Sequence, residues 1–317
     1  MSFTSVSGRA SNGGAALGRM QRDTVEWPTL ALLVLCYVGW AIGTTWAAAL
    51  WLPLGVGVSA LCIALHSSLS HEVLHDHPFR SRPVNEALIF PALGLLIPYQ
   101  RFRDTHLAHH RDAVLTDPYD DPETNYLTPV QWRGLPRWGK TVLGFNNTLL
   151  GRMLIGPLVG QISFMLSDWR AIRAGNSAVL RGWLWHIPAV ALVLWWVIAS
   201  PMPVWAYVIA AYLGLSILKI RTFLEHRAVD RASARTVIIE DRGPLALIFL
   251  NNNLHVVHHT HPKVAWYKLP DLYAQNRAQY LKRNEGYVYR SYAEIFRRYF
   301  WRAKDPVAHP LWPWRRD

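Results

Sequence analysis

The chain has 317 residues, which is enough for one large domain or two ordinary ones. Hydrophobic residues make up 51% of it, a share that alone does not separate a soluble protein from a membrane protein. With only two cysteines, the composition excludes a disulfide-framed scaffold and a cysteine-rich metal site. The formal net charge of +12 at pH 7 indicates an anionic partner. The distribution of the charged residues along the chain indicates whether this partner is a nucleic acid or a membrane surface.

The first 24 residues are rich in Ser, Gly and Ala and predict a disordered N-terminal tail. They lack the continuous apolar core and the cleavage site of a signal peptide. The remaining residues, 25–317, are expected to form a single domain, because no internal repeat and no obvious linker divides them.

Two long stretches without any Asp, Glu, Lys or Arg follow, at residues 28–70 and 182–218. Each exceeds the roughly 20 apolar residues needed for one crossing of a bilayer, and each is long enough to cross twice. Polar residues and prolines interrupt them near residues 44–53 and 200–203, where a hairpin would turn. We therefore expect four transmembrane helices, over residues 28–46, 49–70, 183–199 and 203–220. Long buried helices of a soluble protein are the alternative, but a soluble helix normally carries a polar face.

The placement of Lys and Arg predicts an orientation. Three precede the first span, twelve lie in residues 71–182 and eighteen lie from Lys219 onward, whereas the two hairpin connections carry none. Positive charge marks the cytoplasmic side, so both termini and the segments 71–182 and 221–317 are expected in the cytoplasm. Anionic membrane lipids then account for the net charge, and no nucleic acid is needed. The predicted fold class is an all-α integral membrane protein with four transmembrane helices and a cytoplasmic helical cap.

Two segments of the expected cap are unusually apolar or aromatic. Residues 87–98 form an apolar run that is too short to span a bilayer. An interfacial or re-entrant helix is the first interpretation, and a core helix of the cap is the second. Residues 290–317 mix arginines with Tyr, Phe and Trp, which is typical of a membrane-surface anchor, although a solvated terminal helix fits nearly as well.

Fourteen histidines are present, and eight of them fall in three short motifs. One motif is an H-x-x-x-H pair at the end of the second span and two are H-x-x-H-H triplets: His71 and His75; His106, His109 and His110; His255, His258 and His259. Positions i, i+3 and i+4 share one face of a helix, so each motif can aim its imidazoles at a common point. Imidazole binds iron, zinc, copper and nickel, and eight such ligands are too many for one ion. The motifs therefore predict a dinuclear metal site. Proton relays and pH sensors also use histidine clusters, but they do not explain the repeated spacing.

The other histidines predict lesser roles. His66 lies deeper in the second span and is expected to hydrogen-bond a neighbouring helix. His77 and His261 flank motifs and could support the ligands, whereas His186 and His309 resemble ordinary interfacial or surface residues.

Polar residues beside the motifs are candidates for holding the ligands in place. Metal-bound imidazoles usually donate their second N–H to a carboxylate or carbonyl, and Glu72, Asp104 and Asp112 adjoin the motifs. The three asparagines at 251–253 could serve the last motif in the same way, although a helix N-cap is the simpler interpretation.

In their order and their position relative to the paired spans, the three motifs resemble the histidine boxes of the membrane fatty acid desaturase superfamily. That superfamily also includes alkane hydroxylases and carotenoid hydroxylases and ketolases, and the resemblance covers residues from about 60 to 265. It implies two non-haem iron ions held by the eight box histidines and by one more after the last span, which His226 matches. Stearoyl-type desaturases place an asparagine four residues before that histidine. Here the position is Thr222, so its participation stays open.

The resemblance implies O₂-dependent chemistry on a lipid-like chain, first of all desaturation of a fatty acyl chain, with no catalytic residue beyond the metal ligands. A hydroxylase or ketolase of an alkane, lipid or carotenoid is the alternative within this chemistry. A membrane metal-binding or transport protein is the alternative from another class, but a transporter would need polar groups within its spans. Electrons must come from outside, because the sequence has no His-Pro-Gly-Gly haem motif and no cysteine set for an iron–sulfur centre. A small acidic carrier such as ferredoxin would suit the basic cap.

Overall fold

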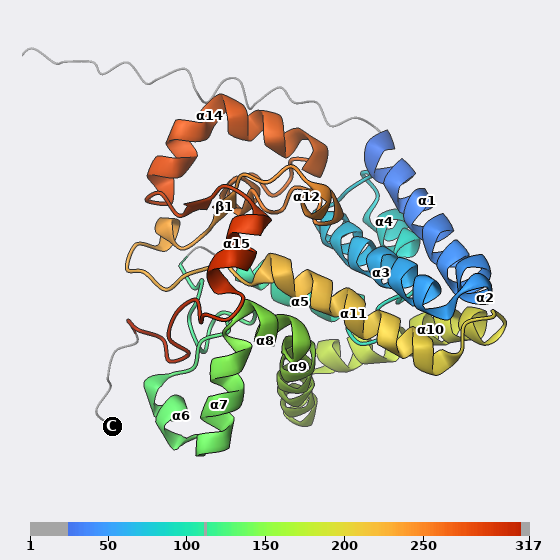
Figure 1. The fold of residues 1–317 in the computed structure, drawn as a ribbon, viewed down its shortest axis with the longest axis horizontal. Helices are drawn as coiled ribbons and strands as arrows, with labels where there is room; N and C mark the ends of the chain where they lie inside the picture. The colour runs from blue at the N-terminus through green and yellow to red at the C-terminus, as the bar shows by residue number, and fades with distance from the viewer. Residues whose placement is uncertain (1–24, 111–112, 312–317) are drawn as a thin grey trace, which may run out of the picture.

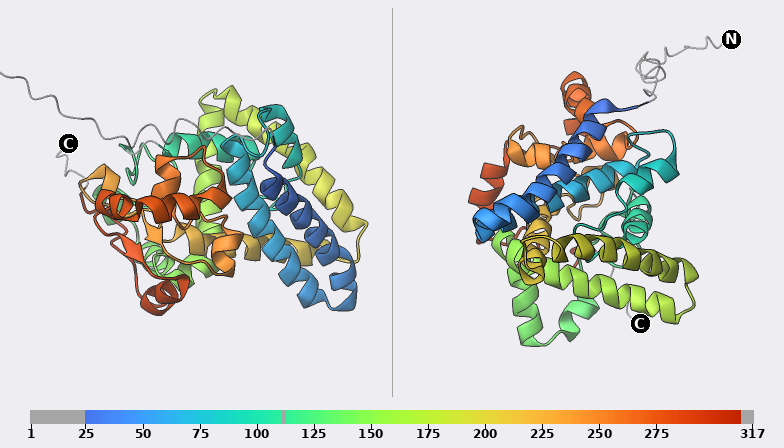
Figure 2. Two further views of the ribbon diagram at one scale, coloured as in Figure 1. Left: turned by 90° about the horizontal axis from the view of Figure 1, so that it is seen from above. Right: turned by 90° about the vertical axis from the view of Figure 1, so that its right-hand side faces the viewer.

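The computed structural model describes residues 25–110 and 113–311. The tail over residues 1–24, predicted to be disordered, lies outside this range. Four helices are long and apolar enough to cross a membrane, which confirms the predicted number of spans: Trp27–Leu50, Leu52–Leu74 (α3), Ser177–Ile198 (α10) and Val204–Thr222 (α11). Figure 1 and the left view of Figure 2 place these helices on one side of the molecule and most of the shorter elements on the other, although α4 lies beside the first two spans.

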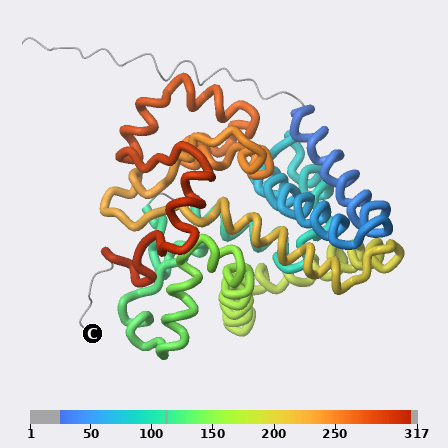
Figure 3. The backbone as a smooth tube through the Cα atoms, viewed as in Figure 1, coloured from blue at the N-terminus to red at the C-terminus, as the bar shows by residue number. Residues whose placement is uncertain are grey.

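The cap is built from short helices joined by loops, and in the described part of the chain its one sheet is a parallel pair of two-residue strands. The fold is therefore all-α, as predicted. Figure 3 shows α11 passing from the spans into the cap, where the chain continues towards the last histidine motif. The cap elements are α4 (Arg82–Leu88), α5 (Tyr99–His109), α6 (Pro129–Gly134), α7 (Arg137–Asn146), α8 (Leu149–Leu154), α9 (Gly156–Arg173), η3 (Ala232–Ala234), β1 (Ile238–Ile239), α12 (Pro244–Ile248), α13 (His255–Thr260), η4 (Trp266–Lys268), α14 (Leu269–Arg283), β2 (Val288–Tyr289) and α15 (Tyr292–Tyr299).

The first span continues to Leu50, beyond its expected end at residue 46. It consists of α1 (Trp27–Ile42), a π-helical segment (Gly43–Ala47) and α2 (Ala48–Leu50). The threonines that were expected to break the helix return hydrogen bonds to its own carbonyls instead. Thr44 Oγ1 donates to Trp40 O at 3.0 Å and Thr45 Oγ1 donates to Ala41 O at 2.6 Å, so neither hydroxyl needs water.

A glycine lets the first two spans approach closely just after the turn. A Cβ on Gly55 would lie 2.6 Å from Ala48 Cα and 2.7 Å from Gly43 O, which no side chain can accommodate. Small residues at such crossings allow the close backbone contact that stabilises helix pairs in membranes.

Residues 89–98 are irregular, so the expected helix over 87–98 is absent. α4 ends at Leu88, and the backbone beyond it is satisfied by side chains of distant helices. Tyr207 Oη donates to Leu93 O at 2.8 Å, His186 Nε2 to Leu95 O at 2.8 Å and Gln161 Nε2 to Leu96 O at 2.9 Å. Irregular backbone at membrane depth is tolerated where it is buried in protein, and Leu93 is fully buried. His186 is therefore a structural residue rather than an ordinary surface one.

Removing the Tyr207 hydroxyl tests this arrangement. The hydroxyl also accepts a bond from Trp40 Nε1 at 2.9 Å, so Tyr207→Phe leaves a buried indole N–H and the Leu93 carbonyl without that partner. We expect the free energy of unfolding in detergent to fall by about 1–2 kcal/mol. Tyr212→Phe removes a single bond at a less buried site and should have the smaller effect. Equal losses in both variants would contradict the proposed role of Tyr207.

α15 does not lie on the membrane by its apolar face. Its apolar side chains Tyr292, Ile295 and Tyr299 are buried in the core of the cap, where they join Phe223 and other residues of a single cluster. The helix itself therefore offers no apolar face to a membrane, but Trp301 directly after it is 76% exposed, so the membrane anchor over 290–317 stays a prediction. Residues 312–317 lie outside the described range.

Candidate metal centre

Four elements carry the nine histidines that the sequence singled out. The last turn of α3 and its C-cap supply the first motif, the end of α5 supplies the second, and α13 supplies the third. His226 comes from the loop after α11. Each motif lies at a helix end and its members leave the helix on one side. Each of the two H-x-x-H-H triplets divides its histidines between two neighbouring groups.

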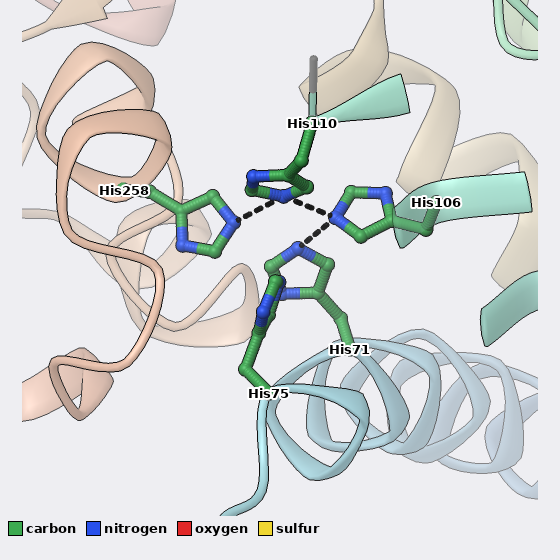
Figure 4. Close-up of side chains that lie close together, drawn as sticks. All are labelled: His71, His75, His106, His110 and His258. Carbon is green, nitrogen blue, oxygen red and sulfur yellow. Dashed lines mark hydrogen bonds between the residues drawn. The ribbon is translucent and has the colours of Figure 1, made fainter. Parts of the chain in front are cut away.

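The structure brings all nine histidines together in two groups. Within each group, candidate ligand nitrogens lie within 4.8 Å of one another. The first group has five members and the second has four: His71, His75, His106, His110 and His258; then His109, His226, His255 and His259. Figure 4 shows the first group, with side chains from three separate segments pointing towards a common centre.

The nitrogen spacing in the first group fits a metal ion. His106 Nε2 lies 3.0 Å from His71 Nε2 and 2.8 Å from His110 Nε2, and His258 Nε2 lies 3.1 Å from His110 Nε2. Two nitrogens bound to one ion at about 2.1 Å, with an angle near a right angle, are separated by about 3 Å. The inward-facing atoms therefore have the spacing of a ligand shell.

The second group has the same inner geometry. His226 Nε2 lies 2.8 Å from His109 Nε2 and 3.2 Å from His255 Nε2. His226 thus joins the group as the resemblance implied. Thr222 ends α11, and within the described residues its hydroxyl forms no hydrogen bond to a histidine of either group.

The outer nitrogens of three histidines are held by polar side chains. Asp121 Oδ1 accepts from His109 Nδ1 at 2.7 Å, and Glu123 Oε1 accepts from His106 Nδ1 at 3.1 Å. Asn252 Oδ1 lies 3.0 Å from His255 Nδ1. A proton held on Nδ1 leaves the lone pair on Nε2, the atom that faces the centre of the group. The ligands are therefore oriented for a metal before it binds.

The sequence identified only part of this outer layer. Asn252 does support a box histidine, and the N-cap alternative fails, because Leu254 caps α13 without a side-chain bond. Glu72 instead accepts from the backbone N–H of Trp266 at 2.8 Å. Asp104 is half exposed and pairs with Arg103 at 2.9 Å. Asp112 lies outside the described residues.

Asp121 and Glu123 were missed. They lie in the acidic stretch 117–123, which begins seven residues after His110. That stretch is the signal that could have revealed them, but sequence spacing alone does not show that the loop folds back onto α5.

The electrostatics keep most of these imidazoles neutral. Burial, reinforced by the neighbouring imidazoles, lowers the pKa of six of them, to about 3 for His110 and well below the usual range for the rest: His75, His226, His255, His258 and His259. Neutral imidazoles have the free lone pair that a metal requires.

His109 behaves differently. Burial opposes its charged form, but the carboxylates of Glu123 and Asp121 outweigh burial and raise its pKa to about 9. Although burial opposes ionisation of Glu123, His106 and His109 hold the pKa of this carboxyl below its usual range. Asp121 thus places a negative charge beside the second group, and Glu123 lies beside both groups, which favours bound cations.

The remaining described histidines have other partners. His66 Nε2 lies 3.2 Å from Tyr37 Oη, which confirms the expected bond to a neighbouring helix. His77 Nδ1 lies 2.8 Å from both carboxylate oxygens of Glu26, so it ties the start of α1 to the loop after the first motif. The rings of His261 and His309 pack edge-on against tyrosines.

The family follows from these motifs and from sequence comparison. The sequence model of the fatty acid desaturase family matches residues 44–291. The chain belongs to this family, part of the membrane desaturase and hydroxylase superfamily, and is an integral-membrane oxidoreductase of that superfamily.

Two curated relatives are similar over most of their length. One is a beta-carotene ketolase from Paracoccus sp. strain PC1, 26% identical over 253 residues, which cover 78% of this chain and 81% of the ketolase. The other is a beta-carotene ketolase from Paracoccus sp. strain N81106 / MBIC 01143, 26% identical over 234 residues, which cover 72% of this chain and 76% of the ketolase.

Proposed function

We propose that the protein is an O₂-dependent di-iron oxygenase that adds oxygen to a long apolar lipid dissolved in the membrane, as a ketolase or hydroxylase does. The observation that carries the proposal is the pair of histidine groups at the cap end of the spans. The nine histidines would hold the two ions, with no catalytic residue beyond them. Iron and O₂ come from the family, and oxygen insertion comes from the two ketolases.

Each part of the site has a chemical task. Two bound irons would supply the redox capacity that reduction of O₂ requires. Asp121 and Glu123 accept from the outer nitrogens of His109 and His106, so that the inner nitrogens point to where the ions would bind. His258 and His106 are almost fully buried, which excludes bulk water from the groups and protects a reactive oxidant.

The spans explain how an apolar substrate reaches the site. The last turn of α3 carries His71, so the first histidine group lies directly at the end of a membrane helix. A lipid can therefore approach without leaving the bilayer. One round of hydroxylation consumes a C–H bond, O₂, two electrons and two protons, and gives an alcohol and water. A second round on the same carbon gives a diol that loses water to form a ketone.

Desaturation of an acyl chain is the second candidate, favoured by the match to the fatty acid desaturase family. It also begins with removal of a hydrogen atom. With O₂, two electrons and two protons it converts two neighbouring methylenes into a double bond and releases two waters. Membership in this family argues against a metal transporter.

The cap and both termini are proposed to face the cytoplasm, because 30 of the 33 Lys and Arg lie at residue 71 or beyond and none lies in the hairpin connections. In a bacterial host the membrane would be the inner one. The electrons would come from an external carrier such as ferredoxin.

Mass spectrometry of a host expressing the protein separates the two reactions. Under ¹⁸O₂, the proposal expects labelled oxygen in a carotenoid such as β-carotene or in another long apolar lipid. A product that has lost two hydrogens without gaining label would instead establish the desaturase. The variant His106→Ala is the matched negative control, and an unchanged lipid profile with β-carotene and acyl lipids both present would contradict both candidates.

A further inference from the structure

The cap contains a pocket of about 340 Å³ behind the second histidine group. Its walls are aromatic and its charges are mostly positive. Tyr126, Tyr289 and Tyr299 line it together with Arg227, Arg298 and Lys304, and Asp305 is the one acidic residue in the lining.

The positive charges of this pocket are only partly compensated. Lys304 Nζ lies 3.4 Å from Asp305 Oδ2, which forms one ion pair. The guanidinium of Arg298 stacks over Tyr289 at 5.7 Å and over Tyr299 at 5.4 Å. Within residues 25–110 and 113–311, neither Arg298 nor Arg227 has a carboxylate partner. Arg227 is held by the backbone O of Ala234 and of Asn284, each at 3.1 Å, and Arg298 is held by the two tyrosine rings. The pocket therefore carries two fixed positive charges that no carboxylate neutralises.

The surroundings favour a protein over a lipid surface. α15, which carries Arg298, buries its apolar side in the core of the cap. Trp301 directly after it is exposed, but one ring offers much less contact with lipids than an apolar helix face would. Figure 1 shows α15 and the chain beyond it on the side of the molecule away from the far ends of the spans. Arg297 and Arg302 are also exposed there and extend the positive surface.

The pocket is connected directly to the second histidine group. Lys304 Nζ donates to the backbone O of His226 at 3.0 Å, and the imidazole of the same residue lies in the group. Between a redox partner bound at the pocket and the proposed metal, His226 would be the main intervening residue. Arg227, which lines the pocket, also directly follows His226 in the chain, so the pocket and the second group share a backbone connection as well.

We propose that this pocket is the docking site of a small acidic electron-transfer protein, which passes electrons to the metal centre through His226. The proposal rests on the proposed function, because that reaction consumes two electrons for each O₂. Two reduced carriers, each a one-electron iron–sulfur protein, would be oxidised in turn while the protons come from water. Complementary charge would steer the encounter, as in other transient redox complexes.

Charge reversal of Arg298 tests the docking site. Reduced plant-type ferredoxin serves as the probe, with the full chain in nanodiscs. At low salt, Arg298→Glu should lower kcat/KM for ferredoxin by about tenfold or more and weaken its binding to a similar degree, and the difference should shrink as salt screens the charges. Turnover driven by dithionite alone should be unchanged. Arg298→Lys should keep most of the ferredoxin-driven activity.

Arg173→Glu is the matched control. Arg173 is also exposed and stacks over Trp169 at 5.9 Å, but it lies at the end of α9, well separated from α15 in Figure 1. An equal loss in Arg173→Glu, or an equal loss with dithionite in Arg298→Glu, would overturn the docking site. A loss seen only in anionic nanodiscs would assign the pocket to lipid headgroups and also overturn it. Ferredoxin binding is measured without turnover, so failure of the proposed reaction is distinguishable from failure of the docking site.

Discussion

Replacing His258 by alanine should lower product formation by at least about 100-fold while the protein still inserts in membranes. His258 is buried in the first group, and its ring centroid lies 4.6 Å from that of His71 and 4.8 Å from that of His75. Loss of a residue that merely supports a metal ligand commonly weakens metal binding 10- to 100-fold, and loss of a ligand should exceed that. The four spans do not include α13, so insertion should be unaffected.

The metal content of the His258→Ala variant should show that the two histidine groups bind separate ions. In His258→Ala we expect occupancy to fall from two ions to about one for each chain, as measured by elemental analysis of the purified protein, because the second group keeps its four histidines. His261→Ala is the matched control, since His261 caps the same helix but its ring packs against Tyr280 instead. Near-normal activity in His258→Ala, or an equal loss in His261→Ala, would be incompatible with the assigned ligand.

The spans and the histidine groups could be predicted because both depend on local spacing. A charge-free stretch indicates a membrane segment without knowledge of its neighbours. The i, i+3 and i+4 spacing places His255, His258 and His259 on one face wherever α13 lies. His226 was the exception. It stands alone in the sequence, and only the resemblance pointed to it.

The features that could not be predicted depend on contacts between distant segments. Residues 89–98 have a helix-like apolar composition, but their carbonyls are bonded by Tyr207, His186 and Gln161 from three other helices. The amphipathic pattern of α15 predicts a buried face without indicating whether a membrane or the cap buries it. The outer partners Asp121 and Glu123 required the fold of a loop. Each of these errors came from judging a pattern without knowing what packs against it.

Asp121→Asn should weaken metal binding at the second group by about 10- to 100-fold. The Asp121 side chain is buried, and besides His109 it accepts from the backbone N–H of Thr116 at 2.8 Å and of Glu123 at 2.9 Å. Asparagine keeps the size of the side chain but removes the charge that holds the proton on His109 Nδ1. Asp117→Asn is the matched control, because Asp117 lies in the same acidic stretch and accepts from the backbone N–H groups of Tyr119 and Asp120.

The same substitution should change how metal binding depends on pH. In the metal-free protein the pKa of His109 is raised to about 9, so at pH 7 the ring carries an extra proton that a metal must displace from Nε2. The charged pair with Asp121 stabilises the metal-free fold fully below about pH 6.5, the ordinary pKa, and this stabilisation is lost as the pH rises towards 9. Metal affinity should therefore rise by about tenfold for each pH unit up to about pH 9.

Asp121→Asn removes one cause of the raised pKa of His109. Metal binding to this variant should therefore release fewer protons at pH 7, and the rise of metal affinity with pH should be less steep. Calorimetric titration of the metal-free protein in buffers of different ionisation enthalpy measures the released protons, and an unchanged number in Asp121→Asn would refute the role of this carboxylate.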